Sequence, residues 1–406
     1  MILEELFAEA LRAIRAHRLR SFLTLLGIII GVATLVGVVS VIAGLNAFVQ
    51  NKVIQLAPDV YVVTKFGIIR SREEFLDAVK RRDFDWNDYL VVARTLQKAE
   101  GVAAQLVGNT AVKHRERRLA DVQVQGTTAN FGTMVGLDIV AGRYFTPIEE
   151  DAAQAVTIIG ADVKDELFPQ QDPLGREVLV GGTPYRVIGL LEKQGRTLGE
   201  ERDRKVFIPF QAYRHQFGTQ DSIDLLIKAR GGVEGVDASV DEVRALLRAL
   251  RHTSFKAPDP FGVVTAESLQ ELWRQISAAA FILSLLIASV SLGVGGIVIM
   301  NIMLVSVVER TQEIGVRRAM GARQKDIRRQ FLVESALLSL AGGLIGVAGG
   351  ALLAIGVRSL LNFPAQVTAG IIGLGIVLAV GVGLAAGYWP ARNASLLPVV
   401  DSLRAE

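Results

Sequence analysis

The sequence predicts an α-helical membrane protein, with four transmembrane helices and a large α+β extracytoplasmic domain inserted between the first and second of them. Half of the 406 residues are hydrophobic and the mean hydropathy is +0.38, which is high for a water-soluble protein. Four stretches carry no charged side chain and are long enough to cross a bilayer, which takes about 20 mainly apolar residues. A long, more polar segment separates the first stretch from the second, and this order defines the fold class.

The first predicted element is a cytoplasmic amphipathic helix over residues 1–20. Ile2, Leu6 and Ile14 fall on one helical face and charged residues occupy the other, as in helices that lie at a membrane surface. A plain extension of the first transmembrane helix into the cytoplasm is the alternative, and the sequence leaves both interpretations open.

The charge-free stretches give four transmembrane helices, and the arginines around them give the orientation. Several arginines precede the first helix and many more lie between the second and third, whereas the connection after the third holds only Arg358. Because Lys and Arg collect on the cytoplasmic side, both termini are expected there, including the tail 390–406. The predicted spans are residues 21–48, 276–308, 335–357 and 369–389.

Residues 53–273 are predicted to be the extracytoplasmic domain. Alternating β-branched residues at 59–64 and an amphipathic pattern at 236–250 indicate β-α-β units near both ends. Many short strand patterns separated by Gly and Pro fill the middle. We expect β-α-β halves at about 53–116 and 221–266, a strand-rich inserted subdomain at about 117–220, and a helical stalk that runs into the second transmembrane helix.

The residues give no sign of catalytic or metal chemistry. The chain has no cysteine, four scattered histidines, and neither a phosphate-binding loop nor a nucleophile elbow, so no catalytic, cofactor or metal site is assigned. The acidic run at 149–151 is interpreted as solvated. The basic run at 113–118 is interpreted as a solvated hairpin, with an anion or partner surface as the alternative. Acidic residues outnumber basic ones between Lys52 and Arg274, so the net positive charge of the whole chain does not indicate nucleic-acid binding.

The spans contain glycines at helical spacing but no Asp, Glu, Lys, Arg or His. The missing charges disfavour an ion-driven carrier. The glycines allow helix backbones to approach closely, either inside one bundle or between two subunits, and both readings stay open. Because four helices are too few to enclose a wide pore, we expect an assembly of at least two subunits. The predicted packing positions are Gly27, Gly31, Gly342, Gly346 and Gly350, with Gly383 and Gly387 as further small residues.

The most distinctive segment is the predicted cytoplasmic loop 309–334. It is charged and compatible with helix, and Gly321 suits a tight turn between two helices. Its stretch ERTQEIGVRRAMGAR resembles the cytoplasmic signature of MacB-type ABC transporter permeases, a superfamily that includes FtsX-like and lipoprotein-releasing permeases. The opening LLGIIIG at 25–31 and the tail, with Pro390 and Pro398, resemble the same family, so the resemblance covers nearly the whole chain.

This resemblance implies a function. The chain would be a non-catalytic permease in a bacterial-type inner membrane, with a porter-like domain outside the cytoplasm. It lacks the ATPase domain that many MacB-type proteins carry ahead of the amphipathic helix, which implies a separate cytoplasmic ABC ATPase subunit that uses the ATP. The resemblance also implies a second permease subunit, with an extracytoplasmic adaptor as a further candidate partner. The expected ATPase-coupling residues are Glu309, Arg310, Glu313, Arg317, Arg318, Met320, Gly321 and Ala322.

Three functions are therefore compared. The leading one is export or mechanotransmission, in which ATP hydrolysis moves the extracytoplasmic domain. The second is an FtsX-like regulator that activates a cell-wall hydrolase. The third is a membrane-anchored enzyme, which the lack of any reactive constellation disfavours. For the loop itself, a purely topogenic role of its arginines is the alternative to ATPase docking.

Overall fold

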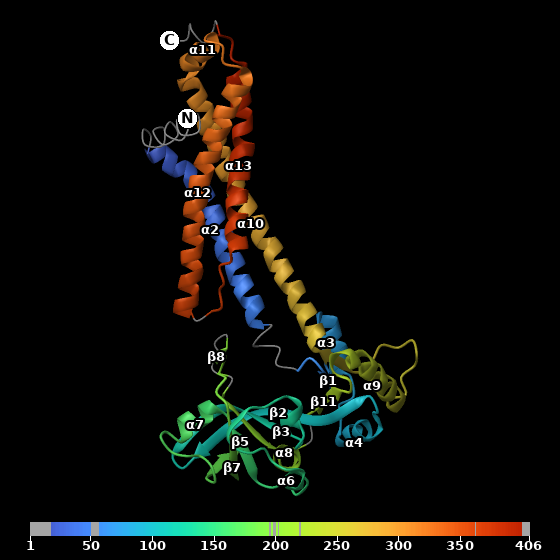
Figure 1. Cartoon of the computed structure of the whole chain (residues 1–406). Coiled ribbons are helices and arrows are strands. Elements are labelled where there is room, and N and C mark those ends of the chain that lie inside the picture. Colours follow the sequence, from blue (N-terminus) through green and yellow to red (C-terminus); the bar gives the residue numbers. More distant parts are fainter. Residues whose placement is uncertain are drawn as a thin grey trace. The chain divides into compact units, whose positions relative to one another are not determined.

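The structure is a computed structural model that describes residues 18–49, 57–194, 196–197, 200–201, 203–218, 221–361 and 363–399. Four described helices are long and apolar enough to cross a membrane, and residues 54–272 form a compact unit of their own between the first and the second (Figure 1). The predicted fold class is therefore confirmed. The predicted amphipathic helix falls mostly on residues 1–17, outside the described part.

Each membrane helix extends beyond its predicted span. The second, α10, already begins at the stalk, because no Pro or Gly interrupts the chain before Gly293. The third begins eleven residues early, so helix occupies much of the predicted loop 309–334, and the fourth continues past Pro390 into the predicted tail. A charge-free stretch defines only the apolar part of a helix. The helix itself is longer, because the flanking charged residues also have good helix propensity. The bounds are α2 Arg18–Phe48, α10 Ala266–Glu309, α12 Gln324–Leu361 and α13 Ala369–Leu396.

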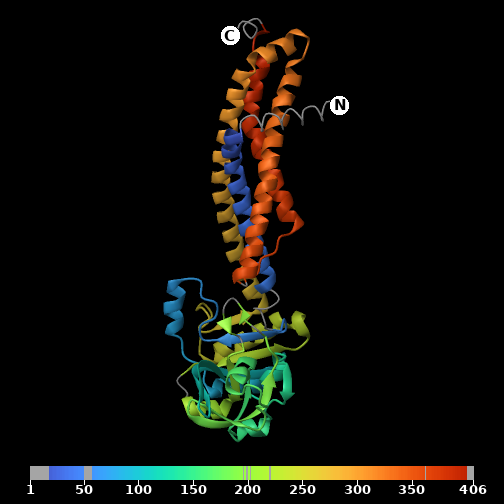
Figure 2. The same ribbon diagram turned by 90° about the vertical axis from the view of Figure 1, so that its left-hand side faces the viewer.

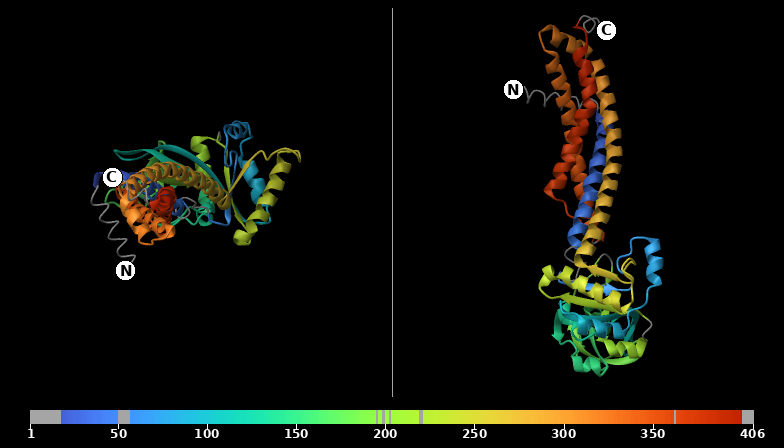
Figure 3. Two further views of the ribbon diagram at one scale, coloured as in Figure 1. Left: turned by 90° about the horizontal axis from the view of Figure 1, so that it is seen from above. Right: turned by 90° about the vertical axis from the view of Figure 1, so that its right-hand side faces the viewer.

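The helical unit is a bundle in which α2, α12 and α13 lie side by side and α10 runs along α2 (Figure 2 and the right view of Figure 3). Its core is made of fully buried aliphatic side chains, among them Ile28, Val32 and Leu35 of α2. Large apolar residues such as Leu352 and Leu353 remain exposed on the outside. An apolar exterior of this kind suits a lipid environment.

The unit formed by residues 54–272 is built on one mixed sheet, in which ten strands are described. The order is β12-β1-β11-β2-β3-β10-β5-β7-β4, and β6 pairs with both β2 and β7. All pairs are antiparallel except β10 with β3 and β5 with β7. The strands are β1 Val60–Thr64, β2 Ala99–His114, β3 Arg117–Thr127, β4 Ile139–Gly142, β5 Val156–Ile159, β6 Glu177–Val180, β7 Thr183–Leu191, β10 Lys205–Pro209, β11 Asp224–Ala229 and β12 Gly262–Thr265.

Both faces of this sheet are buried. In β1, Tyr61 and Val63 point to one core and Val60 to the other, as the alternation of a strand requires. Residues of α4, α7, α8 and α9 join the first core, and residues of α5 join the second. The helices of the unit are α3 Arg72–Val79, α4 Trp86–Thr95, α5 Phe131–Met134, α6 Pro147–Asp151, α7 Ala161–Leu167, α8 Phe210–Phe217 and α9 Val236–Leu250.

The predicted border between the β-α-β half and the inserted subdomain, at 116/117, falls in the turn of the β2–β3 hairpin. Hydrogen bonding continues across it, because β2 pairs with β11 over its first half and with β3 over its second. The hairpin carries the basic run at 113–118, with Arg115 at a positive φ of 53° at its tip. A division into two subdomains stays a prediction, since one continuous sheet links them.

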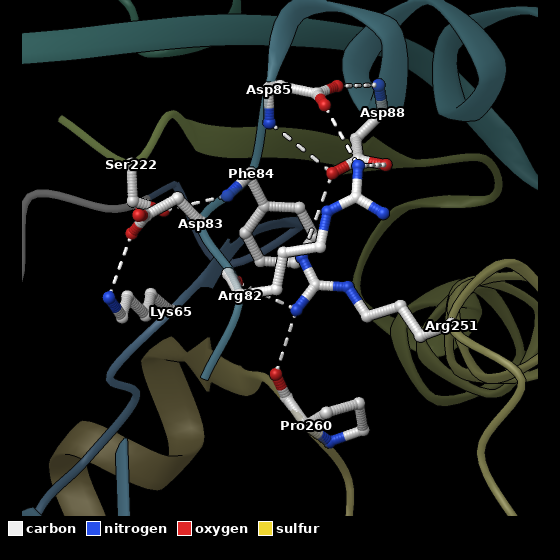
Figure 4. A network of polar contacts seen from close by, with 9 residues as sticks. All are labelled: Lys65, Arg82, Asp83, Phe84, Asp85, Asp88, Ser222, Arg251 and Pro260. Atoms are coloured by element: carbon white, nitrogen blue, oxygen red, sulfur yellow. Dashed lines mark hydrogen bonds and ion pairs between the residues drawn. The ribbon is translucent and has the colours of Figure 1, made fainter. Parts of the chain in front are cut away.

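A buried arginine holds one end of the sheet unit together (Figure 4). Arg251, which follows α9, donates from Nη1 to the carbonyl oxygens of Arg82 at 2.9 Å and Pro260 at 3.0 Å. Its guanidinium lies 4.1 Å from the ring centroid of Phe84, and Nη2 lies 3.7 Å from Oδ2 of Asp88. Burial lowers the pKa of Arg251 below its usual value. One side chain thereby joins α9, α4 and the segment before β12.

Candidate functional site

The candidate site is the short helix α11, Thr311–Ala319, which connects α10 to α12. It ends in a Schellman motif: the N–H of Ala322 donates to the carbonyl of Arg317 and the N–H of Gly321 to that of Arg318, both at 3.1 Å. Gly321 has φ +101°, while a Cβ at that position would meet nothing within 4 Å. The turn therefore requires glycine for its backbone conformation and not for space.

The arginines of α11 make contacts within the helical unit. Arg317 donates to Oε1 of Gln330 at 2.7 Å and to Oε1 of Glu313 at 2.6 Å. Arg318 donates to the carbonyl oxygen of Leu397 at 2.5 Å. These bonds join α11 to α12 and to the residue that follows α13, so both arginines position the helix. The sequence carries no signal for Gln330 or Leu397, which lie 13 and 79 residues after the arginines that bind them.

The two sides of α11 differ in exposure. Ile314 is 4% exposed and packs into the core of the helical unit with Phe331. On the other side Val316 is 42% and Met320 is 77% exposed, and Ala319 and Gly321 between them are also exposed. We call these four residues, 316 and 319–321, the α11 tip. The sequence singled out Met320 and Gly321 but missed Val316 and Ala319, which continue the same apolar surface.

The other predicted coupling residues surround this tip. Glu309 and Glu313 are exposed, whereas Arg310 and Ala322 are half-buried. Arg310 lies 3.4 Å from the carboxylate of Glu334 on α12. The structure thus brings the predicted set together around one short helix, with the charges on its flanks and the apolar residues at its end.

The predicted packing glycines lie against neighbouring helices of the same chain. A Cβ at Gly27 would lie 2.8 Å from the Cα of Gly295 on α10, and one at Gly31 would lie 3.0 Å from Leu292. On α12, added Cβ atoms would lie 3.2 Å from Leu25 for Gly342, 2.9 Å from the Ile29 oxygen for Gly346 and 2.7 Å from the Ala33 oxygen for Gly350. These five glycines therefore pack inside one bundle.

Two serines and an asparagine add contacts that the sequence analysis did not identify. Ser335 and Ser339 are fully buried where α12 meets α13, at Gly387 and Gly383. Near the end of α2, Oδ1 of Asn46 accepts from Nε1 of Trp273 and from Oγ of Ser277, both at 2.7 Å. Asn46 therefore links α2 to α10 by polar contacts.

The acidic run in the sheet unit corrects a prediction. Glu149 and Glu150 are each only 8% exposed, so the interpretation of a solvated run is wrong for both. Glu149 accepts two bonds of 2.7 Å from Arg143 and caps α6 with Thr146, and the Arg143 guanidinium is the main reason that its pKa falls to about 2. Burial raises the pKa of Glu150 to about 7, although its Oε2 accepts from the backbone N–H of Ala129.

Glu150 should make the stability of the sheet unit depend on pH. Between its ordinary pKa of 4.5 and about 7, folded Glu150 holds a proton that the unfolded chain has released. The folded state then binds more protons, so the stability that this group contributes is lost as pH rises through the window. Glu150→Gln should raise the melting temperature at pH 8 toward the wild-type value at pH 5. Thermal unfolding in detergent at both pH values measures this, and a variant with the wild-type pH dependence would contradict it.

The described residues contain no group of three or more His, Cys, Asp or Glu placed to hold a metal ion. An apolar cavity lies instead on the helical unit. A cavity of about 660 Å³ between α2 and α12 is lined by Ala33, Gly349, Leu352, Leu353, Gly356, Val357 and Leu360. Its lining has no group suited to chemistry.

Comparison with known proteins identifies the family. Relatives include the macrolide export ATP-binding/permease protein MacB of Azoarcus sp. strain BH72, 35% identical over all of this chain, and MacB 2 of Aeromonas hydrophila, 33% identical over 98% of it. The chain spans 60% of the length of each. The crystal structure of the periplasmic region of MacB from Actinobacillus actinomycetemcomitans matches 55% of this chain, and 96% of that chain is covered, at 14% identity and a TM-score of 0.46. Residues 21–250 match the MacB-like periplasmic core domain and residues 285–398 the FtsX-like permease C-terminal domain, so the protein belongs to the family of MacB-type, FtsX-like permeases.

Proposed function

We propose that the protein is the transmembrane permease subunit of a MacB-type ABC transporter. It couples ATP hydrolysis by a separate ABC ATPase subunit to movement of the unit formed by residues 54–272, for export or mechanotransmission. That unit is extracytoplasmic, both termini and α11 are cytoplasmic, and the membrane is a bacterial-type inner membrane. The chain is non-catalytic, binds no cofactor directly and works with a second permease subunit; an extracytoplasmic adaptor is a further partner.

The α11 tip is the observation that carries this proposal. Val316, Ala319 and Met320 expose apolar surface at the end of a helix that Ile314, Arg317 and Arg318 hold in place. A fixed apolar tip with charged flanks is suited to insertion into a groove of a cytoplasmic protein. Because its supports reach α12 and the end of α13, a displacement of the tip would be transmitted to the membrane helices.

The sequence and the family add two supports. The 406 residues contain no phosphate-binding loop, so the ATPase site of such a transporter lies elsewhere than in these residues. The match of residues 21–250 to the MacB-like core favours this branch over an FtsX-like regulator of a cell-wall hydrolase.

Docking at the α11 tip predicts a large effect of one substitution. Met320→Glu places an unpaired charge in the middle of the proposed contact and should weaken binding of the ATPase by about tenfold or more. Co-purification of the co-expressed ATPase with the full chain from detergent measures this. Met320→Leu keeps the apolar surface and should retain binding. If no ABC ATPase of the same cell co-purifies with the wild type, or if Met320→Glu binds as well as Met320→Leu, the docking proposal is wrong.

The same position tests the orientation. Met320→Cys would be the only cysteine in the chain. It should react with a membrane-impermeant thiol reagent only after the cells are permeabilised. Labelling in intact cells would place α11 outside the cytoplasm and reverse the proposed topology.

A further inference from the structure

An apolar patch in the unit formed by residues 54–272 faces away from its core. Phe66, Phe75, Leu76 and Val79 are 39%, 47%, 51% and 46% exposed, and we call them the α3 patch. Single exposed apolar residues are common, but these four are contiguous. The rings of Phe66 and Phe75 stack with centroids 6.2 Å apart, and Phe75, Leu76 and Val79 share one side of α3. Ala78 alone among the residues of α3 is buried.

The patch is held on a fixed base. Arg81 donates from Nη1 to the carbonyl oxygens of Lys65 at 2.9 Å and Phe66 at 3.2 Å, which closes the segment that contains α3. Ser71 caps α3 by accepting from the N–H of Glu74. The backbone of Gly67 lies so close to Gly262 of β12 that a Cβ there would come within 2.7 Å of its Cα. The exposed side chains therefore belong to an anchored element.

Basic residues edge the patch. Arg70 and Arg72 are exposed, whereas Nζ of Lys80 pairs with Oδ1 of Asp77 at 3.1 Å. Nζ of Lys65 lies 5.6 Å from the ring centroid of Phe66 and 2.9 Å from Oδ1 of Asp83. At 100° per residue, the acidic residues of α3 fall on the side away from Phe75 and Val79. Aromatic and aliphatic side chains with a basic edge are typical of helices that contact the surface of a bilayer. The acidic residues of α3 are Glu73, Glu74 and Asp77.

The course of the chain places a bilayer within reach. β12 pairs with β1, from which the α3 segment continues, and α10 begins at the next residue after Thr265. The charge-free apolar stretch of α10 begins after Arg274, so only nine helical residues, a rise of about 14 Å, lie between the sheet and that stretch. Figure 2 shows α3 standing off the sheet of its own unit.

We propose that the α3 patch is a lipid-contacting surface, at which the unit formed by residues 54–272 touches the headgroup region of the bilayer that the chain's own helices span. The contact buries the apolar side chains of the patch among headgroups and sets Arg70 and Arg72 near lipid phosphates. It does not depend on ATPase docking at α11, because it involves only the sheet unit and the membrane.

A fluorescent probe on α3 tests the contact directly. Leu76→Cys introduces a single cysteine, which is labelled with an environment-sensitive nitrobenzoxadiazole. The labelled chain is reconstituted into nanodiscs of phosphatidylethanolamine and phosphatidylglycerol. Its emission should lie at a shorter wavelength than that of the same label at a site exposed to water. Lipids spin-labelled near the headgroup should quench it. The matched control is Ile148→Cys on α6, which is 78% exposed in the same unit and should show neither effect.

A second substitution and the stoichiometry separate the outcomes. Adding Phe75→Glu to the Leu76→Cys chain should shift its emission to longer wavelength and abolish quenching, while Ile148→Cys is unaffected. Emission and quenching at Leu76 equal to those at Ile148 would overturn the proposal. A short-wavelength emission without lipid quenching, present in discs with two chains and lost in discs with one, would assign the patch to a second copy instead and would equally overturn it.

Discussion

Gly346→Leu is expected to prevent stable assembly of the helical unit. An added Cβ at this position would lie 2.9 Å from the carbonyl oxygen of Ile29 and from Cβ of Val32, and neither atom is the flexible end of a side chain. Overpacking typically costs about 1–3 kcal/mol and more where backbone must move, so α2 and α12 should separate. We expect loss of the monodisperse peak in size-exclusion chromatography in detergent and a lower melting temperature.

Gly356→Leu is the matched control, because Gly356 lies on the same helix and an added Cβ there would meet nothing within 4 Å. It makes the same chemical change without overpacking and should behave like wild type. Gly346→Ala should fall between the two and keeps the comparison informative if the leucine variant does not fold. Equal behaviour of Gly346→Leu and Gly356→Leu would show that the close approach of α2 and α12 is not needed.

Arg251→Leu should destabilise the sheet unit by about 3 kcal/mol. The substitution leaves the carboxylate of Asp88, whose side chain is 8% exposed, without its buried partner, and removes the donor from the carbonyls of Arg82 and Pro260. This loss of unfolding free energy lies at the lower end of the range for broken buried ion pairs. The reason is that a second cation remains near the carboxylate, because Nη2 of Arg82 lies 4.0 Å from Asp88. For a unit of this size the melting temperature should fall by about 6–12 °C.

Arg244→Leu, within α9 and seven residues before Arg251, provides the comparison. Arg244 also binds carboxylates, at 2.9 Å to Asp259 and 3.1 Å to Asp241, but its side chain is 42% exposed, so the loss should be about 1 kcal/mol or less. The double substitution Arg251→Leu with Asp88→Asn should cost less than the sum of the single ones, because no unpaired charge remains. An Arg251→Leu effect no larger than that of Arg244→Leu would refute the role assigned to this network.

The membrane helices and most of the strands could be predicted from the sequence because their signals are local. A run without charge marks a span whatever surrounds it, and the alternation at residues 59–64 marks β1 for the same reason. Helix α6 was also predictable, since Thr146-Pro147 followed by Glu149 is a capping-box pattern, yet it was missed. The membrane helices continue past the predicted apolar spans, because apolar length and helix length are different quantities.

The roles of individual charges could not be predicted, because they depend on residues distant in the chain. Arg318 donates to the carbonyl of Leu397, 79 residues later, and no local pattern in the sequence indicates this contact. Glu150 was interpreted as solvated, but its partner is the N–H of Ala129, 21 residues earlier. Composition gives the number of such groups, whereas only the tertiary fold decides which of them are buried.

The pairing of β1 with β12 has a consequence for how the chain is organised. Tyr61 opposes Thr265, so the first and last strands of the sheet are neighbours, and the residues at which β1 begins and β12 ends lie about 5 Å apart. Once the sheet unit has folded, pairing α2 with α10 closes a loop no longer than a short hairpin. The entropic cost of that pairing therefore does not grow with the number of inserted residues. The size of the insert is thereby decoupled from helix pairing: strands or loops can be gained or lost on the far side of the sheet while the junction with the membrane helices stays the same.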